Sequence, residues 1–297
     1  MKEFRNEVAV VTGAGSGIGR ALALALAREG ARLAIADNNA KSLEETAKLV
    51  RAEQKTTGTD GLFVRELDVA QRDAVYQFAD EVAQKLDDAS LVINNAGVAQ
   101  VASVPNLALK DLEWVMGINY WGVVYGTQAF LPAMLRRNHG HVVNISSVFG
   151  LIGVAAQAAY CSAKFAVLGY TESLRHDLRA TNIGVSVVHP GGIQTNIARQ
   201  ARHNQGPDLV ERQKTMTERF DEIAITAPPK AAEVILRGVR KNRPRILIGR
   251  DAVIIDWARR LFPVNYRRFL PFGGEDEAVF ADDIEFGTEK KPNPPAS

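Results

Sequence analysis

The stretch Val8-Ala-Val-Val-Thr12, followed directly by Gly13-Ala-Gly-Ser-Gly-Ile-Gly19, decides how this chain folds. Residues 8–12 form an apolar run typical of a buried strand, and residues 21–29 have the spacing of a helix that ends at Gly30. Glycines between a strand and a helix let the backbone approach a phosphate, and the helix N-terminus offers free N–H groups and a positive dipole end. A tight turn without a ligand is the simpler alternative, but this context favours a site for a dinucleotide pyrophosphate.

A carboxylate follows the second predicted strand. Residues 33–36 are apolar, and Asp37 stands at the C-terminal end of this run, about 20 residues past the glycines. In this position a carboxylate accepts hydrogen bonds from the adenosine ribose and repels a 2′-phosphate. Asn38 and Asn39 supply no compensating cation, so we expect NAD rather than NADP. A structural role for Asp37, as the N-cap of the helix that includes Lys41, is compatible with the same residue.

Further strands and helices alternate along the chain. We expect strands at 62–67, 91–93, 142–145, 185–188 and 245–248, and helices at 40–54, 71–86, 107–137, 157–180 and 231–240. Pro132 is expected to kink or end the helix in which it lies. The alternation predicts an α/β protein with one doubly wound, Rossmann-type domain, a mostly parallel seven-stranded sheet and helices on both faces. Ligands of such sheets bind at the C-terminal strand ends, where the sequence places Gly13, Asp37, Asp68, Asn94, Ser147 and Pro190.

Tyr160 and Lys164 are four residues apart on a predicted helix and therefore lie on one face. A free tyrosine titrates near ~10, and an ammonium group one turn away lowers this pKa because it favours the phenolate. Ser147, at the end of the preceding strand, is placed to hydrogen-bond a substrate oxygen. These groups predict acid–base chemistry without a metal, although a tyrosine and a lysine at this spacing also occur by chance on surface helices.

Composition narrows the class of protein. The 297 residues are 46% hydrophobic and 24% charged, which is typical of a soluble globular protein, and the net charge of +2 argues against a nucleic-acid partner. The N-terminus shows no apolar signal region and no run approaches the ~18 apolar residues of a membrane span, so we expect a cytoplasmic protein. The single cysteine, Cys161, excludes internal disulfides. His189 is expected to pack at a strand end, and no His, Cys and Asp cluster has the spacing of a metal site.

Residues 8–195 closely resemble the short-chain dehydrogenase/reductase family, with every principal motif in order. Thr12-Gly-x-x-x-Gly-Ile-Gly19 resembles the cofactor loop, and Asp68-Val69 resembles the adenine contact. Asn94-Asn-Ala-Gly97 resembles the motif that stabilises the central strand, and Pro190-Gly191 with Thr195 the segment that holds the nicotinamide carboxamide. The resemblance implies that the cofactor contacts come from Gly13, Ser16, Gly17, Ile18, Gly19, Asp37, Asp68, Val69, Asn95, Ala96, Gly97, Tyr160, Lys164, Pro190, Gly191, Ile193 and Thr195.

The same resemblance implies a catalytic tetrad of Asn119, Ser147, Tyr160 and Lys164. Ser147 is preferred to Ser146 because it precedes Tyr160 by 13 residues, as in many family members. Tyr160 would exchange the proton of an alcohol while hydride passes to or from the nicotinamide, and Lys164 would lower the Tyr160 pKa and hold the nicotinamide ribose. Ser147 would polarise the carbonyl, and Asn119 would support a water that relays protons. A non-catalytic dinucleotide-binding regulator is the alternative, and the complete tetrad argues against it.

The end of the chain departs from the family pattern. We expect a dinucleotide-binding and catalytic domain at 1–250 with a substrate lid at about 194–226, an amphipathic extension at 251–272 and a disordered tail at 273–297. The extension carries an apolar helical face destined for the domain's own core, a partner subunit or, ranked behind these, a membrane surface: Ile254, Ile255, Ala258, Leu261 and Phe262. This apolar surface favours a lipophilic alcohol, ketone or aldehyde as substrate. By resemblance, we expect a homodimer or homotetramer formed through the helices at 107–137 and 157–180.

Overall fold

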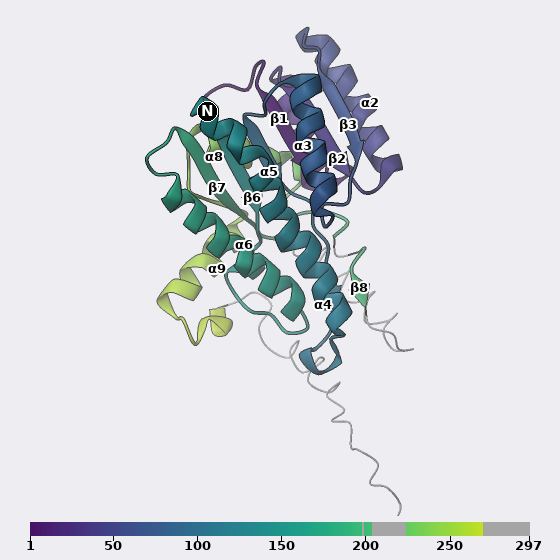
Figure 1. The fold of residues 1–297 in the computed structure, drawn as a ribbon. Coiled ribbons are helices and arrows are strands. Elements are labelled where there is room, and N and C mark those ends of the chain that lie inside the picture. Colours follow the sequence, from purple (N-terminus) through teal and green to yellow (C-terminus); the bar gives the residue numbers. More distant parts are fainter. Residues whose placement is uncertain (198, 204–223, 270–297) are drawn as a thin grey trace, which may run out of the picture.

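Seven strands form the central sheet in the order β3-β2-β1-β4-β6-β7-β9, and every neighbouring pair is parallel. The computed structural model describes residues 1–197, 199–203 and 224–269 (Figure 1). From one edge to the other the strands are β3 (Leu62–Glu66), β2 (Arg32–Asp37), β1 (Val8–Thr12), β4 (Leu91–Asn94), β6 (Gly140–Ile145), β7 (Ile183–Pro190) and β9 (Arg245–Ile248). The chain reverses its direction of winding between β1 and β4, which creates the crevice where such sheets bind ligands. The expected doubly wound α/β fold is confirmed.

Helices cover both faces of this sheet (Figure 1). One face packs against α1 (Gly17–Arg28), α2 (Ala40–Thr57) and α8 (Pro228–Arg240), and the other against α3 (Arg72–Leu86), α5 (Gly122–Arg137) and α6 (Ala158–Asp177). The N-cap of α2 is Asn39, whose side chain accepts a hydrogen bond from the Ser42 N–H. The capping role considered for Asp37 therefore belongs to Asn39.

The long helix expected before β6 is divided in two. A π-helical turn, Gly117–Trp121, separates α4 (Leu109–Met116) from α5, and such turns are frequent at functional sites. The helix does not end at Pro132, because α5 continues to Arg137. Met134, two residues after Pro132, is fully buried in the core. This packing stabilises the helix even though Pro132 has no backbone N–H to donate to the preceding turn.

A small second sheet joins β5 (Gln100–Val101) to β8 (Arg202–His203) in parallel. The sequence did not indicate these strands, because two residues show no periodicity. They connect the segment after β4 to the beginning of the predicted lid, where the Arg202 guanidinium stacks 3.5 Å over the Trp114 ring. Most of the lid lies outside the described residues.

The predicted extension forms α9 (Arg250–Leu261) and a 3-10 turn, Tyr266–Phe269. The apolar face expected there is divided by the structure: Ile255 and Ala258 are buried against the domain, whereas Ile254 and Leu261 are exposed. The five apolar residues expected to share one face cannot all be buried in a single contact, because a helix that packs on one side buries only part of its circumference. The tail at 273–297 lies outside the described residues.

Buried polar side chains connect the central strands to the helices. Asn94 on β4 donates hydrogen bonds to Asn144 Oδ1 on β6 at 2.9 Å and to Thr127 Oγ1 on α5 at 3.1 Å. Asn144 in turn donates to Thr171 Oγ1 on α6 at 3.0 Å. All four side chains are buried. Gly126 leaves room for this arrangement, because a Cβ at that position would collide with Asn94 Oδ1.

We expect Asn144→Ala to lower the free energy of unfolding by about 2–3 kcal/mol, because the Asn94 amide and the Thr171 hydroxyl would lose a partner where water has no access. Denaturant unfolding followed by circular dichroism measures this change. The exposed Asn38 serves as the control, and Asn38→Ala should stay within about 0.5 kcal/mol of the parent chain. Equal effects of the two substitutions would contradict a structural role for the network.

Candidate active site

The glycine-rich turn ends β1 and begins α1. Gly13 and Gly17 have φ values of +64° and +52°, a region open mainly to glycine, and a Cβ on Gly19 would collide with the Gly13 carbonyl. Ser16 is the exposed N-cap of α1, and its hydroxyl makes no capping hydrogen bond within the described structure. Ile18 follows, half-buried. The turn thus presents backbone N–H groups and a hydroxyl to an anion at the helix N-terminus.

Asp37 lies beside this turn. Its carboxylate oxygens accept hydrogen bonds from the Gly15 N–H at 2.8 Å and the Asn39 N–H at 2.9 Å. The side chain is only half-buried, and a carboxylate has about four lone-pair sites, so acceptor capacity remains for ribose hydroxyls.

Arg20 fastens the turn to α2, although nothing in the sequence analysis singled it out. Its guanidinium donates to the Gly15 and Ser42 carbonyls, to Thr46 Oγ1 at 2.9 Å and to Glu45 at 3.2 Å. The available signal was a lone cation at the start of an otherwise apolar helix. These contacts hold the phosphate-binding turn and the N-terminal end of α2 together.

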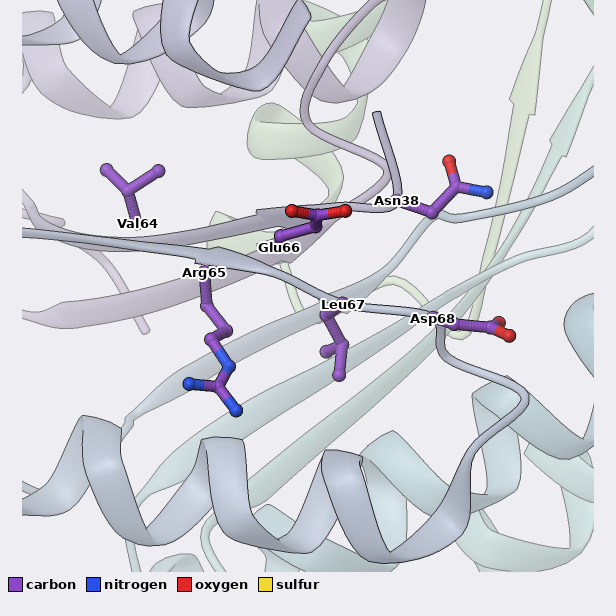
Figure 2. Close-up of a pocket in the computed structure, with 6 residues that line it drawn as sticks. All are labelled: Asn38, Val64, Arg65, Glu66, Leu67 and Asp68. Carbon is purple, nitrogen blue, oxygen red and sulfur yellow. The ribbon is translucent and has the colours of Figure 1, made fainter. Parts of the chain in front are cut away.

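A pocket lies at the C-terminal ends of β2 and β3, at the predicted adenine end of the site (Figure 2). Asn38 and Asp68 project from the strand ends in Figure 2, whereas Arg65 points away from them. Arg65 is the only cation that lines this pocket among the described residues, and it pairs with Glu81 on α3 at 3.3 Å. Asp68 is exposed and Val69 is buried, so they present a carboxylate and an anchored backbone to this end.

Asn95 joins the ends of β4 and β1. Its Nδ2 donates to the carbonyls of Thr12 at 2.9 Å and Gly13 at 3.2 Å. In return, Thr12 Oγ1 accepts hydrogen bonds from the backbone N–H groups of Asn95 at 3.0 Å and Ala96 at 3.2 Å. Thr12 therefore positions the predicted cofactor motifs that follow β1 and β4. In the sequence, only its place directly before the glycine-rich turn indicates this role.

The loop after β7 approaches the glycine turn from the other side. Pro190 is buried at the end of β7, Ile193 is buried in the core, and the Thr195 side chain faces Gly17. A Cβ on Gly17 would lie 3.0 Å from Thr195 Cγ2. The first and last cofactor motifs of the sequence are therefore neighbours in space.

Asp251 holds this loop from α9. Its Oδ2 accepts a hydrogen bond from the Gly192 N–H at 2.7 Å, and a Cβ on Gly191 would collide with the same carboxylate. From the sequence alone, Asp251 is expected to belong to a separate extension. The structure instead makes α9 a support of the predicted nicotinamide loop.

Ser147 follows β6 and caps a 3-10 turn, Val148–Gly150. Its Oγ accepts a hydrogen bond from the Phe149 N–H at 3.1 Å, and its side chain also hydrogen-bonds with Tyr160. His189 Nδ1 donates to the Ser147 carbonyl at 2.9 Å, because a carbonyl oxygen can only accept. His189 is fully buried, which confirms the expected packed strand-end histidine, and burial lowers its pKa to about 4.

Lys164 lies one helical turn from Tyr160, as expected. Its Nζ is 5.6 Å from the centre of the Tyr160 ring and donates a hydrogen bond to the Ile145 carbonyl at 3.0 Å. Burial lowers the pKa of Lys164 to about 8, so most of the amine is protonated at neutral pH. Burial also raises the pKa of Tyr160 to about 12, and the hydrogen bond with Ser147 opposes this only in part. The expected net lowering of the Tyr160 pKa is therefore wrong for this structure, because lost hydration of the phenolate dominates.

Asn119 is fully buried in the π-helical turn. Its Oδ1 accepts a hydrogen bond from the Val98 N–H at 2.8 Å, and its Nδ2 donates to the Val98 carbonyl at 2.8 Å. Gly97 brings it to the other groups, since a Cβ there would lie 3.3 Å from Asn119 Oδ1 and 3.5 Å from Lys164 Nζ. The four predicted catalytic residues are thus gathered at one edge of the sheet.

The residues of this edge fit a dinucleotide. A glycine cradle at a helix N-terminus, a carboxylate for a ribose and a buried lysine follow one another along it. Within the described part of the chain, no His, Cys, Asp and Glu side chains come together in a group of three or more suited to a metal ion. In the same part, none of the helices is long and apolar enough to cross a membrane.

Known proteins resemble this chain in sequence and structure. The family model described as short chain dehydrogenase matches residues 7–206. SadH of Mycobacterium tuberculosis is 42% identical over 276 residues, which cover 92% of this chain and 97% of SadH. Estradiol 17-beta-dehydrogenase 11 of Rattus norvegicus is 31% identical over 268 residues, with coverages of 89% and 83%. A short chain dehydrogenase/reductase from Burkholderia phymatum, solved in complex with NAD, superposes with a TM-score of 0.80 at 29% identity over 88% of this chain and 95% of that one.

The buried lysine should make stability depend on pH. The pKa of Lys164 is lower in the fold than its ordinary value of 10.5, so the unfolded chain binds more protons between pH 8 and 10.5. We therefore expect the stability of the parent chain, relative to Lys164→Met, to rise by up to about 3 kcal/mol as pH increases through this window. Urea unfolding of both proteins at pH 7.5 and pH 10 measures the difference, and other titrating groups cancel. A stability difference independent of pH would contradict the lowered pKa.

Proposed function

The chain belongs to the short-chain dehydrogenase/reductase family, and from this premise we propose that it is an NAD(P)-dependent oxidoreductase that interconverts a secondary alcohol and a ketone, or the corresponding alcohol and an aldehyde. One observation carries this proposal. Ser147, Tyr160, Lys164 and Asn119 converge at the C-terminal edge of the sheet, next to the glycine turn. A proton-transfer group, a hydroxyl donor and a cation then meet at one point.

The chemistry divides between the cofactor and the chain. When bound, the nicotinamide supplies or accepts the hydride. In the reductive direction the neutral Tyr160 hydroxyl donates a proton to the carbonyl oxygen, which its high pKa allows at neutral pH. Ser147 holds the same oxygen by a hydrogen bond. In the oxidative direction the phenolate form of Tyr160 accepts the alcohol proton, and the Lys164 ammonium stabilises this phenolate before the transfer.

Asn119 and Lys164 hold the remainder of the site. The two hydrogen bonds with Val98 fix the Asn119 side chain, and Gly97 lets Lys164 approach it. We assign to this pair the support of a water that exchanges protons between the site and solvent. A regulator that binds the dinucleotide without catalysis is the alternative, but it would have no use for a buried lysine that destabilises the fold.

NAD is favoured over NADP by the charges around the adenosine end. Asp37 would lie against a 2′-phosphate, where two anions repel each other. Two arginines near this end are engaged by carboxylates, since Arg20 bonds to Glu45 and Arg65 pairs with Glu81. NAD is the cofactor in the Burkholderia phymatum structure, which agrees with this proposal.

A lipophilic substrate is favoured by the surroundings of Tyr160. The Phe149 ring packs edge-on against the Tyr160 ring with 6.3 Å between ring centres. Val148 and Ile152, in the same segment, continue into an apolar cluster with α9. Estradiol 17-beta-dehydrogenase 11 is named for a steroid substrate, which agrees with an apolar alcohol or ketone.

A homodimer or homotetramer is supported by the exposed Trp121 and Phe165 near the outer faces of α5 and α6.

Replacement of Tyr160 tests the mechanism. A panel of secondary alcohols, sterols and retinoids with NAD identifies a substrate for the parent chain. We expect Tyr160→Phe to lower kcat by about 100-fold or more, because the proton-transfer group is lost. Tyr170, on the same helix, hydrogen-bonds with Gln128 at 3.4 Å, and Tyr170→Phe should retain parent activity. Parent turnover by Tyr160→Phe would overturn the mechanism, whereas NADH binding without turnover on any substrate would favour the regulator.

Replacement of Asp37 tests the cofactor. Fluorescence titration should show NADH binding at least about tenfold tighter than NADPH, because the carboxylate repels the 2′-phosphate. Asp37→Ala should narrow this ratio, whereas Asp60→Ala, which changes an exposed carboxylate, should leave it unchanged. Tighter binding of NADPH by the parent chain would contradict the assignment to NAD.

A further inference from the structure

Helix α9 carries two apolar faces, and only one is covered by the described residues. The inner face packs Ala252 and Ile255 against Val148 and Ile152. The outer face exposes large apolar side chains at three- and four-residue steps, a spacing that forms one continuous stripe: Val253 (42% exposed), Ile254 (52%), Trp257 (59%) and Leu261 (63%). We call these four residues the α9 stripe. A contiguous exposed patch of this kind indicates a contact surface, unlike single apolar residues at a surface.

Exposed cations lie on α9 and in the turn that follows it, whereas the two carboxylates of α9 are already engaged with other residues. Arg250 lies one turn before Val253 and Ile254 on α9, and Arg268 lies in the turn that follows the helix; both are exposed and have no ion pair among the described residues, whereas the exposed Arg260 pairs with Asp256 at 3.2 Å. Asp251 accepts the hydrogen bond from the Gly192 N–H, and Asp256 pairs with Arg245 at 2.8 Å. A ligand of this surface therefore needs apolar groups and negative charge together.

We propose that residues 275–286 of the same chain cover the α9 stripe. This segment reads Glu-Asp-Glu-Ala-Val-Phe-Ala-Asp-Asp-Ile-Glu-Phe and contains six carboxylates and no cation. Its large apolar residues, Val279, Phe280, Ile284 and Phe286, are interspersed with the acidic ones. Both requirements of the surface, apolar contact and anions for the exposed arginines, are met by this one stretch of sequence.

The covalent connection is long enough for this contact. The Tyr266–Phe269 turn lies against α9, where the Arg259 guanidinium is 5.1 Å from the centre of the Tyr266 ring. Residues 270–274 then link the turn to the acidic segment, and five extended residues span about 17 Å. A helix of 12 residues is about 18 Å long. The segment therefore reaches most of the stripe, and the short tether gives it an effective concentration in the millimolar range.

Two other occupants fit the surface less well. An anionic membrane would attract the arginines, but it would repel the six carboxylates tethered close by. A second copy of α9 would bring like-charged arginines together, which disfavours a symmetric contact through this face. The inference does not depend on the proposed oxidoreductase activity, because it concerns only α9 and the segment that follows it.

Hydrogen exchange of the full-length protein tests the contact. Protection of the α9 amides, measured by mass spectrometry, should fall by about fivefold when the six carboxylates of 275–286 are changed to amides, because the covering segment leaves the helix. Arg250→Gln combined with Arg268→Gln should produce a similar fall. A protein that carries these two substitutions together with the six tail substitutions should lose little more α9 protection than either set alone causes. Arg51→Gln with Arg72→Gln, which alters two exposed arginines on α2 and α3, is the matched control and should leave α9 protection unchanged.

Several outcomes would overturn the inference. Unchanged α9 protection after the tail substitutions would show that the segment does not cover the helix. Light scattering that shows a smaller assembly after the tail substitutions would assign the segment to a neighbouring copy. A smaller assembly after Trp257→Ala alone would assign the stripe to a contact between copies. Binding of the full-length protein to phosphatidylcholine–phosphatidylserine vesicles that is lost in Trp257→Ala would assign the stripe to a membrane.

Discussion

The hydrogen bond between the side chains of Asn94 and Asn144 sits at the centre of the sheet, and the site depends on it. Both residues occupy positions that are otherwise apolar in buried parallel strands, so their amides must find partners inside the protein. They find them in each other and in Thr127 and Thr171 on α5 and α6, two of the three helices that cover this face; among the described residues, only the Asn94 side-chain oxygen lacks a partner within this network. The network sets β4 and β6 against α5 and α6, and these four elements carry the catalytic candidates or lead directly into them.

The residues that directly follow the central strands place polar groups at the C-terminal edge of the sheet. Asn95 leaves β4 and bonds back to Thr12 and Gly13, which locks the glycine turn to the centre of the sheet. Ser147 follows β6, and its carbonyl accepts a hydrogen bond from His189 on the neighbouring strand β7. Backbone and side-chain hydrogen bonds, rather than ion pairs, thus fix the geometry. This suits the proposed site, in which Lys164 carries the one buried charge among the described residues.

Burial of Lys164 opposes stability, and the proposed acid–base role gives a reason for keeping it there. Removing an ammonium from water is unfavourable, which the lowered pKa of about 8 expresses, and a single carbonyl hydrogen bond restores only part of the lost hydration. The same burial raises the Tyr160 pKa to about 12, so the tyrosine is a proton donor in the structure described. Formation of the phenolate is unfavourable in these surroundings, and the Lys164 ammonium, 5.6 Å from the centre of the Tyr160 ring, is the nearby cation that would offset this cost.

The sequence by itself determined the fold and predicted which residues gather at one edge of the sheet. Apolar runs, glycines and strand-end polar residues from Gly13 to Pro190 are local signals, and parallel topology brings all strand C-termini to one edge. Tertiary structure alone decided what depends on contacts between distant segments. The hydrophobic periodicity of the sequence does not indicate such contacts. Examples are the pairing of Arg20 with α2, the hydrogen bond from Gly192 to Asp251 and the division of α9 into covered and exposed faces. The direction of the Tyr160 pKa shift belongs to the same class, because residue spacing reveals which charges are close but not how much water the fold removes.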